Sequence, residues 1–72
     1  MNDMSLIKRF EKQYHLVIGK DGQPTGYGQR FAAMELIKLC EMLDPQMFYG
    51  NSKNGMMNIE NIQALAKEIG VI

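Results

Sequence analysis

The side chains that could act as nucleophiles in this sequence are few. It contains one cysteine, Cys40, one histidine, His15, and the serines Ser5 and Ser52. Nucleophilic catalysis needs a nucleophile, a base and an orienting group that meet in space. Cys40 falls within an apolar helical pattern, where a thiol usually acts as a small buried hydrophobe. We therefore predict no catalytic residue and a protein that binds rather than catalyses.

Ligands for a metal or a cofactor are equally scarce. One histidine and a single cysteine provide no metal-ligand spacing. The stretch Gly26-Tyr27-Gly28 precedes a predicted helix, and such a loop can bind phosphate through its backbone amides, here with Arg30 nearby. It has neither the Lys-Ser/Thr pair nor the full glycine pattern of a nucleotide-binding loop. We interpret it as a flexible entry into the helix and predict no metal and no cofactor.

Basic side chains raise an alternative function, nucleic-acid binding. Lys8, Arg9 and Lys12 fall on one side of a predicted helix, and with Arg30 they could contact backbone phosphates. The whole chain, however, has eight Lys and Arg against eight Asp and Glu, whereas nucleic-acid binders usually show a basic excess. Three cations on one helix are more often a solvated face, although a dimer would double the patch. A small nucleic-acid-associated transcriptional regulator is therefore the alternative hypothesis.

Methionine is the most unusual feature of the composition, with seven in 72 residues. Methionine is flexible and polarisable, and it is over-used on surfaces that adapt to partners. Met34, Met42 and Phe31 fall on the otherwise charged side of their predicted helix, where they either fill a core or form an exposed apolar patch. The candidate protein interface adds two residues of the following turn and comprises Phe31, Met34, Met42, Met47 and Phe48.

Three predicted helices position these side chains. Residues 5–14 carry an apolar stripe at helical spacing, and residues 29–43 form the clearest helix, apolar on nearly all sides. Residues 59–69 begin after Asn58, a strong N-cap, and end at Gly70, a left-handed C-terminal cap. We predict a mainly α fold, a small three-helix domain in which helix 29–43 is the central element.

The segments between the helices are less regular. Residues 15–18 could form a short strand and residues 20–23 a turn, so the connection between the first two helices is predicted to be either a short β-hairpin or an ordered loop. Asp44-Pro45 ends the second helix, because the residue before a proline is biased away from helical geometry. A short turn holding Met47 and Phe48 follows, and residues 51–55 are predicted to be a polar loop.

The length predicts a single small domain over residues 1–72. A chain this short buries only about 60% of its unfolded surface, so its own core is barely sufficient. Because one cysteine allows no internal disulfide, association is the remaining source of stability. We therefore predict a protein partner and a homodimer, and we interpret the chain as a small regulator or inhibitor of a larger protein. Such chains are common in phages and mobile elements.

Targeting signals are missing from the sequence pattern. No run approaches the roughly 20 apolar residues that a membrane span needs, so we predict no membrane association. The first residues lack the basic region and apolar stretch of a signal peptide. A cytoplasmic location is the expectation.

One stretch resembles a known family. Residues 64–71, Ala-Leu-Ala-Lys-Glu-Ile-Gly-Val, look like the first helix and turn of a bacterial helix-turn-helix. In that family the glycine begins the turn, and a recognition helix follows and enters the major groove. The resemblance covers about eight residues and no such helix follows it in this sequence, so we assign it no DNA-reading role.

Overall fold

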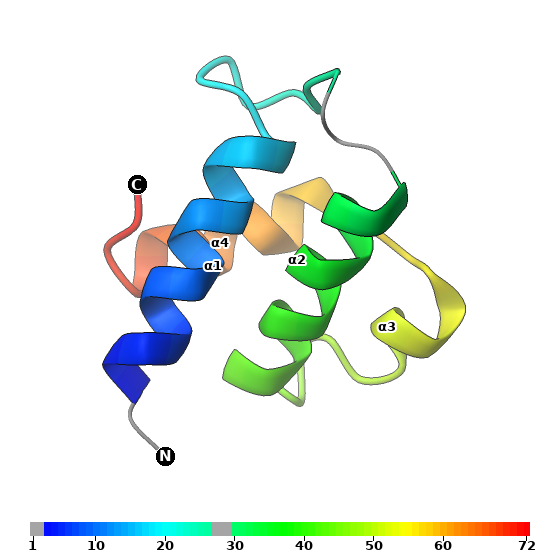
Figure 1. The fold of residues 1–72 in the computed structure, drawn as a ribbon. Helices are drawn as coiled ribbons and strands as arrows, with labels where there is room; N and C mark the ends of the chain where they lie inside the picture. Colours follow the sequence, from blue (N-terminus) through cyan, green and yellow to red (C-terminus); the bar gives the residue numbers. More distant parts are fainter. Residues whose placement is uncertain (1–2, 27–29) are drawn as a thin grey trace.

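The computed structural model describes residues 3–26 and 30–72. This part of the chain is mainly helical, which confirms the predicted fold class, and its helices are α1 (Asp3–Val17), α2 (Arg30–Leu43), α3 (Asn51–Asn54) and α4 (Ile59–Glu68). Helices α1 and α2 lie side by side and run in opposite directions, while α3 flanks α2 on the side away from α1 (Figure 1). Helix α4 crosses behind α1 and α2 (Figure 1).

Helix α1 extends further than its sequence pattern predicts. The short strand considered as one alternative for residues 15–18 does not form, because the helix continues to Val17 and the Ile18 N–H still donates to the Tyr14 carbonyl at 2.8 Å. Val17 and Ile18 are buried together with Phe10 and Tyr14, so they continue the apolar stripe of the helix. Burial on one helical face here outweighs the preference of branched side chains for strands.

The connection between α1 and α2 begins with a tight turn. The Gly19 N–H donates to the Gln23 carbonyl at 2.8 Å, and one antiparallel bridge joins Ile18 to Pro24. A single bridge is less than a regular β-hairpin. In its described part, this connection is therefore an ordered loop.

The same turn is tied to helices at both ends of the chain. The Thr25 hydroxyl donates to the Leu16 carbonyl at 2.6 Å, which satisfies one of the last carbonyls of α1. Gly22 has a φ of 79°, a conformation that favours glycine, and its carbonyl accepts a hydrogen bond from Gln63 Nε2 of α4 at 3.2 Å. The turn thus links α1 to α4.

Helix α3 replaces the polar loop predicted for residues 51–55, and that prediction is wrong. Gly50 and Gly55 flank α3 with φ values of 75° and 65°. The Glu41 carboxylate of α2 accepts the Gly50 N–H at 2.9 Å and the Ser52 hydroxyl at 2.6 Å. A polar stretch becomes helical here because a side chain from another helix satisfies groups in its first turn.

Helix α4 begins at Ile59 as predicted and ends at Glu68, one residue before the predicted end, with both predicted caps in place. The Asn58 side chain accepts the Asn61 N–H at 3.1 Å, which is the N-cap bond. Gly70 has a φ of 84°, and the Val71 N–H donates to the Ala66 carbonyl at 2.8 Å, a bond of the Schellman motif. The helix therefore begins and ends where its own sequence directs.

The hydrophobic core draws on α1, α2, α4 and the turn after α2. Helix α2 approaches α1 and α3 most closely, and α4 completes the core with side chains. The buried cluster consists of Leu6, Phe10, Tyr14, Val17, Ile18, Leu36, Leu39, Cys40, Phe48, Ile62, Leu65 and Ala66.

Candidate functional site

One side of α2 carries an exposed row of side chains between the contacts of this helix with α1 and α3. Phe31 is 87% exposed and Met42 is 48% exposed, and they stand near opposite ends of the helix. Lys38, exposed, and Glu35, half-buried, lie between them. With 3.6 residues per turn, these four side chains lie within about 60° of one another around the helix axis. We call this row of Phe31, Glu35, Lys38 and Met42 the α2 ridge.

The edge of the ridge nearest α1 is held by polar contacts. Arg9 Nη2 donates to Glu35 Oε1 at 3.0 Å, and Gln13 Nε2 donates to the Ala32 carbonyl at 3.2 Å. The Arg9 and Glu35 side chains are 58% and 42% exposed, so their ion pair adds little stability. Its structural effect is to direct Glu35 Oε1 toward α1.

The other edge of the ridge faces α3. Met34 is half-buried there, and its Sδ lies 3.9 Å from the position that a Cβ on Gly55 would occupy. Glu41 lies further along the same side of α2, where its carboxylate holds the start of α3. The α3 turn thus supports the ridge from the side and leaves its top open.

The predicted protein interface is only partly brought together. Phe31 and Met42 are on the ridge, and Met34 is at its edge, whereas Met47 is 41% exposed in the turn after α2. Phe48 is 1% exposed and belongs to the core, so its assignment to an exposed interface is wrong. Burial of a large apolar ring is strongly favourable, and the turn directs this ring inward.

Sequence reasoning missed the polar half of the ridge and one exposed ring. Helical spacing alone places Glu35 and Lys38 between Phe31 and Met42, so the sequence pattern is sufficient to include them in the site. Tyr49 is 87% exposed beside a hollow that Glu41 also lines. No pattern in the sequence signals this, because it depends on which side of the turn at residues 45–50 meets the core.

The basic residues of the alternative hypothesis are not gathered into an unopposed patch. Lys8, Arg9 and Lys12 are exposed on α1, but Arg9 is paired with Glu35. Glu11 adds a negative charge to the exposed part of the same helix. The side chain of Arg30 lies outside the described residues, as does most of the stretch Gly26-Tyr27-Gly28.

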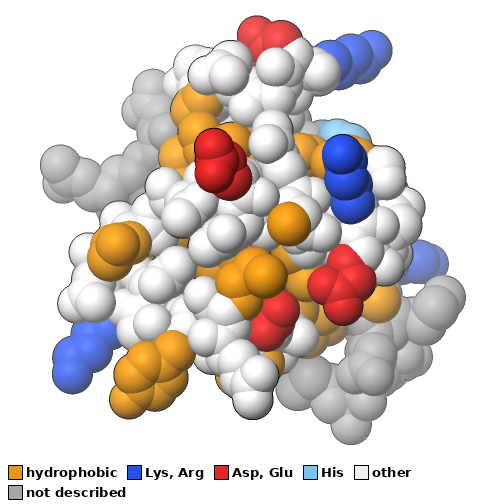
Figure 2. All heavy atoms as spheres, turned by 180° about the vertical axis from the view of Figure 1, so that it is seen from behind, with side chains coloured by type: hydrophobic (Ala, Val, Ile, Leu, Met, Phe, Trp, Pro, Cys, Tyr) orange, Lys and Arg blue, Asp and Glu red, His pale blue; other side chains and the backbone are white. Residues whose placement is uncertain are grey.

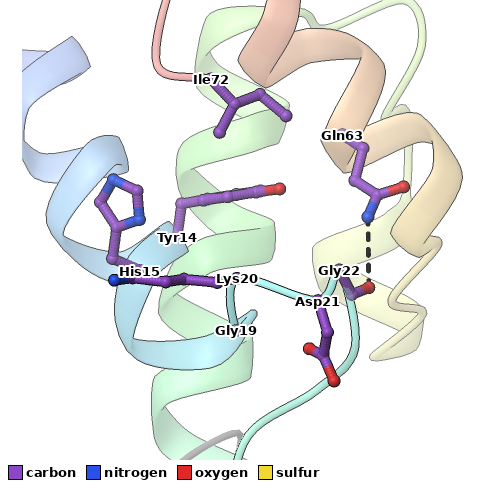
Figure 3. A pocket seen from close by; sticks show the side chains of 8 residues that line it. All are labelled: Tyr14, His15, Gly19, Lys20, Asp21, Gly22, Gln63 and Ile72. Carbon is purple, nitrogen blue, oxygen red and sulfur yellow. Dashed lines mark hydrogen bonds between the residues drawn. The ribbon is translucent and has the colours of Figure 1, made fainter.

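A hollow lies between the end of α1, the turn at residues 19–22 and α4 (Figure 3). Tyr14 is 4% exposed, its ring extends across the hollow, and burial raises the pKa of its hydroxyl (Figure 3). Gln63 in the lining of the hollow donates to the Gly22 carbonyl at 3.2 Å, and the lining contains no serine, threonine or cysteine. The lining residues are Tyr14, His15, Gly19, Lys20, Asp21, Gly22, Gln63 and Ile72.

The interpretation of Cys40 as a buried hydrophobe is confirmed. The side chain is 0% exposed, and burial raises the pKa of the thiol to about 12. Because the thiolate is the reactive form, a thiol with this pKa is inert at neutral pH.

Metal and membrane features can be assessed within the described ranges. Among residues 3–26 and 30–72, no three His, Cys, Asp or Glu side chains come close enough together to hold a metal ion. None of the helices in the described part is both long and apolar enough to cross a membrane.

The face opposite to the view of Figure 1 carries both apolar and charged side chains. Figure 2 shows hydrophobic side chains there in several patches, with acidic and basic side chains between them. On this face charged groups therefore interrupt the apolar surface.

Comparison of the chain with protein-family models, with curated proteins and with solved structures finds no match. The function is therefore inferred from the residues of the chain itself.

Proposed function

We propose that this protein is a non-enzymatic protein-interaction module that binds a protein partner through the α2 ridge. The observation that carries this proposal is the 87% exposure of Phe31 at one end of a row that ends in the exposed Met42. Burying a side chain such as phenylalanine in a contact is worth about 1.5–3 kcal/mol. Aromatic side chains of this kind are typical anchors of protein interfaces.

The small size of the chain suits a regulator or inhibitor of a larger protein. Helix α2 packs against α1 along one edge of the ridge and against α3 along the other. Pre-organised surfaces lose less conformational entropy on binding than flexible ones. We infer that the ridge is the binding element and that α1 and α3 hold it in place.

Nucleic-acid binding has less support as the function. Arg9 forms an ion pair with Glu35, and Lys8 and Lys12 lie on the same helix as the acidic residue Glu11. If nucleic acid were the ligand, affinity would fall steeply with salt concentration, because phosphate contacts release counterions.

The test replaces Phe31 with aspartate and uses Tyr49→Asp as a matched control. Both rings are 87% exposed, so both variants should keep the helical circular dichroism of the wild type. Phe31→Asp should weaken protein association about tenfold or more, as loss of an interface anchor does, and Tyr49→Asp should leave it unchanged. Association is measured by pull-down from native lysate, with and without nuclease, and by sedimentation of the purified chain.

Each outcome of this experiment has a definite meaning. A protein captured by the wild type and by Tyr49→Asp, but lost with Phe31→Asp, supports the proposal. Capture that disappears with nuclease favours the basic residues of α1 instead. If Phe31→Asp and Met34→Lys both unfold the chain, these side chains are core and the proposal fails.

A further inference from the structure

The α2 ridge has a self-complementary order of side chains. From its N-terminal end the order is apolar, acidic, basic, apolar, carried by Phe31, Glu35, Lys38 and Met42. The spacings between neighbours are symmetric about the middle of the row, because the outer two gaps are equal. Reversing the direction of the helix therefore places each apolar end opposite an apolar end and each charge opposite its counter-charge.

We propose that the partner of the α2 ridge is a second copy of this chain, with the two α2 helices packed antiparallel about a twofold axis near the middle of the ridge. In this arrangement Phe31 meets the partner's Met42, and Glu35 meets the partner's Lys38. The twofold axis repeats both contacts, as it does in any isologous dimer. This proposal rests on the proposed function, because it names the partner of the same surface.

One acceptor oxygen of Glu35 and the Lys38 ammonium remain for this contact in the monomer. Glu35 uses Oε1 for Arg9, and the described residues provide no hydrogen-bond donor to its Oε2. Lys38 is exposed and has no ion pair within the part of the chain that the structure describes. Each chain therefore presents one acceptor and one cation that its own described side chains do not satisfy.

Charge also selects the antiparallel direction over the parallel one. In a parallel pair about an axis along the helices, Glu35 would face the partner's Glu35, and Lys38 would face the partner's Lys38. Like charges placed opposite each other disfavour an association, whereas the antiparallel pair replaces both repulsions with attractions. The apolar ends would be buried on either side of the charged centre.

The test uses charge reversal, since both positions are at least partly exposed and tolerate it. Glu35→Lys gives two cations in the centre of the ridge, and Lys38→Glu gives two anions. The dimer dissociation constant of each single variant should be about tenfold or more above that of the wild type, because the twofold axis places each reversed pair in the interface twice. The readout is the dimer dissociation constant from sedimentation equilibrium at low salt, with circular dichroism to check the fold.

Mixing the two single variants restores complementarity across the interface. The cations of Glu35→Lys then face the anions of Lys38→Glu, so the mixture should form a heterodimer with affinity within a few-fold of the wild type. The double variant Glu35→Lys/Lys38→Glu restores the charge pairs within a homodimer and should also associate. The exposed Lys8→Glu on α1 is the control, because it lies off the ridge and should dimerise like the wild type.

The outcomes separate this inference from the proposed function. A wild-type chain that stays monomeric at high concentration overturns the inference, yet the proposed function stands if another protein still binds through Phe31. If Phe31→Asp disrupts the dimer but charge reversal does not affect it, the antiparallel register is wrong, while the ridge remains the interface. A dimer that neither change affects uses another surface, so the inference fails, and the proposed function then stands only if another protein binds through Phe31.

Discussion

The Cys40 thiol lies in the core with no exposed surface, and burial raises its pKa from an ordinary 9.0 to about 12. As the pH rises, the unfolded chain releases this proton before the folded chain does. Because of this thiol, the free energy of unfolding should stay constant below pH 9. It should fall between pH 9 and about 12, by up to about 1.4 kcal/mol per pH unit. Urea unfolding curves recorded from pH 7 upward measure this fall.

A Cys40→Ala variant provides the reference for that measurement. Tyr14 also has a raised pKa and contributes to the alkaline loss of stability in both proteins, so the difference between the two slopes isolates the thiol. Equal slopes would show that Cys40 is not held in its protonated form. The variant itself should lower stability only modestly, because it removes one small buried atom.

Two phenylalanines show what can be predicted for single residues from the sequence. Phe31 lies on the polar side of a long helical pattern, which left open whether its ring is exposed or fills a core, and the structure shows it 87% exposed. Phe48 lies in a short turn without periodicity, so nothing in the sequence distinguished an inward ring from an outward one. Tyr49, the next residue, is 87% exposed, and its direction was unpredictable for the same reason.

Among the elements, those with their own start and stop signals were predictable. Asn58 and Gly70 define α4 by local bonds, and the structure contains both caps. Helix α3 was not predictable, because its start depends on Glu41, which lies on a different helix. The extension of α1 to Val17 likewise depends on burial by distant parts of the chain.

The dependence of α3 on Glu41 can be tested directly. Glu41→Ala removes the acceptor of the Gly50 N–H and the Ser52 hydroxyl, and both groups lie in a partly buried environment. We expect a loss of about 1–3 kcal/mol in the free energy of unfolding, typical of deleting a charged hydrogen-bond acceptor. Amide hydrogen exchange should show faster exchange at Gly50, with little change in α4.

A surface substitution in α3 is the control for this loss. Lys53→Ala changes an exposed side chain of the same short helix and should alter stability by less than about 0.5 kcal/mol. If the two variants were equally stable, the carboxylate would be dispensable and α3 would be held by packing alone.

For the whole molecule, the helical periodicity was enough to predict a small mainly α fold with three principal helices. The core residues of α1, α2 and α4 follow from the same periodicity, whereas Phe48, in the turn after α2, does not. The candidate site is less predictable. Its apolar ends follow from the pattern of α2, whereas its open top depends on where α1 and α3 pack.

Association of the whole molecule should be visible in its thermal stability. If two chains share the α2 ridge, the midpoint of thermal unfolding must rise with protein concentration, because dimerisation stabilises only the folded state. We expect this rise for the wild type and a constant midpoint for Phe31→Asp. Calorimetry over a hundredfold range of concentration distinguishes the two, and a constant midpoint for both would contradict the dimer.

The hydrogen bond from Gln63 to Gly22 has a consequence for the order in which the chain assembles. It joins residues 41 positions apart, whereas the contact of Gln13 with Ala32 joins residues 19 positions apart. Closing a loop of twice the length costs about 0.6 kcal/mol more, which corresponds to roughly a threefold slower step. We expect α1 and α2 to pair before the folding barrier is crossed and α4 to dock after it. Substitutions in α4 should then act mainly on the rate of unfolding, and those between α1 and α2 on the rate of folding.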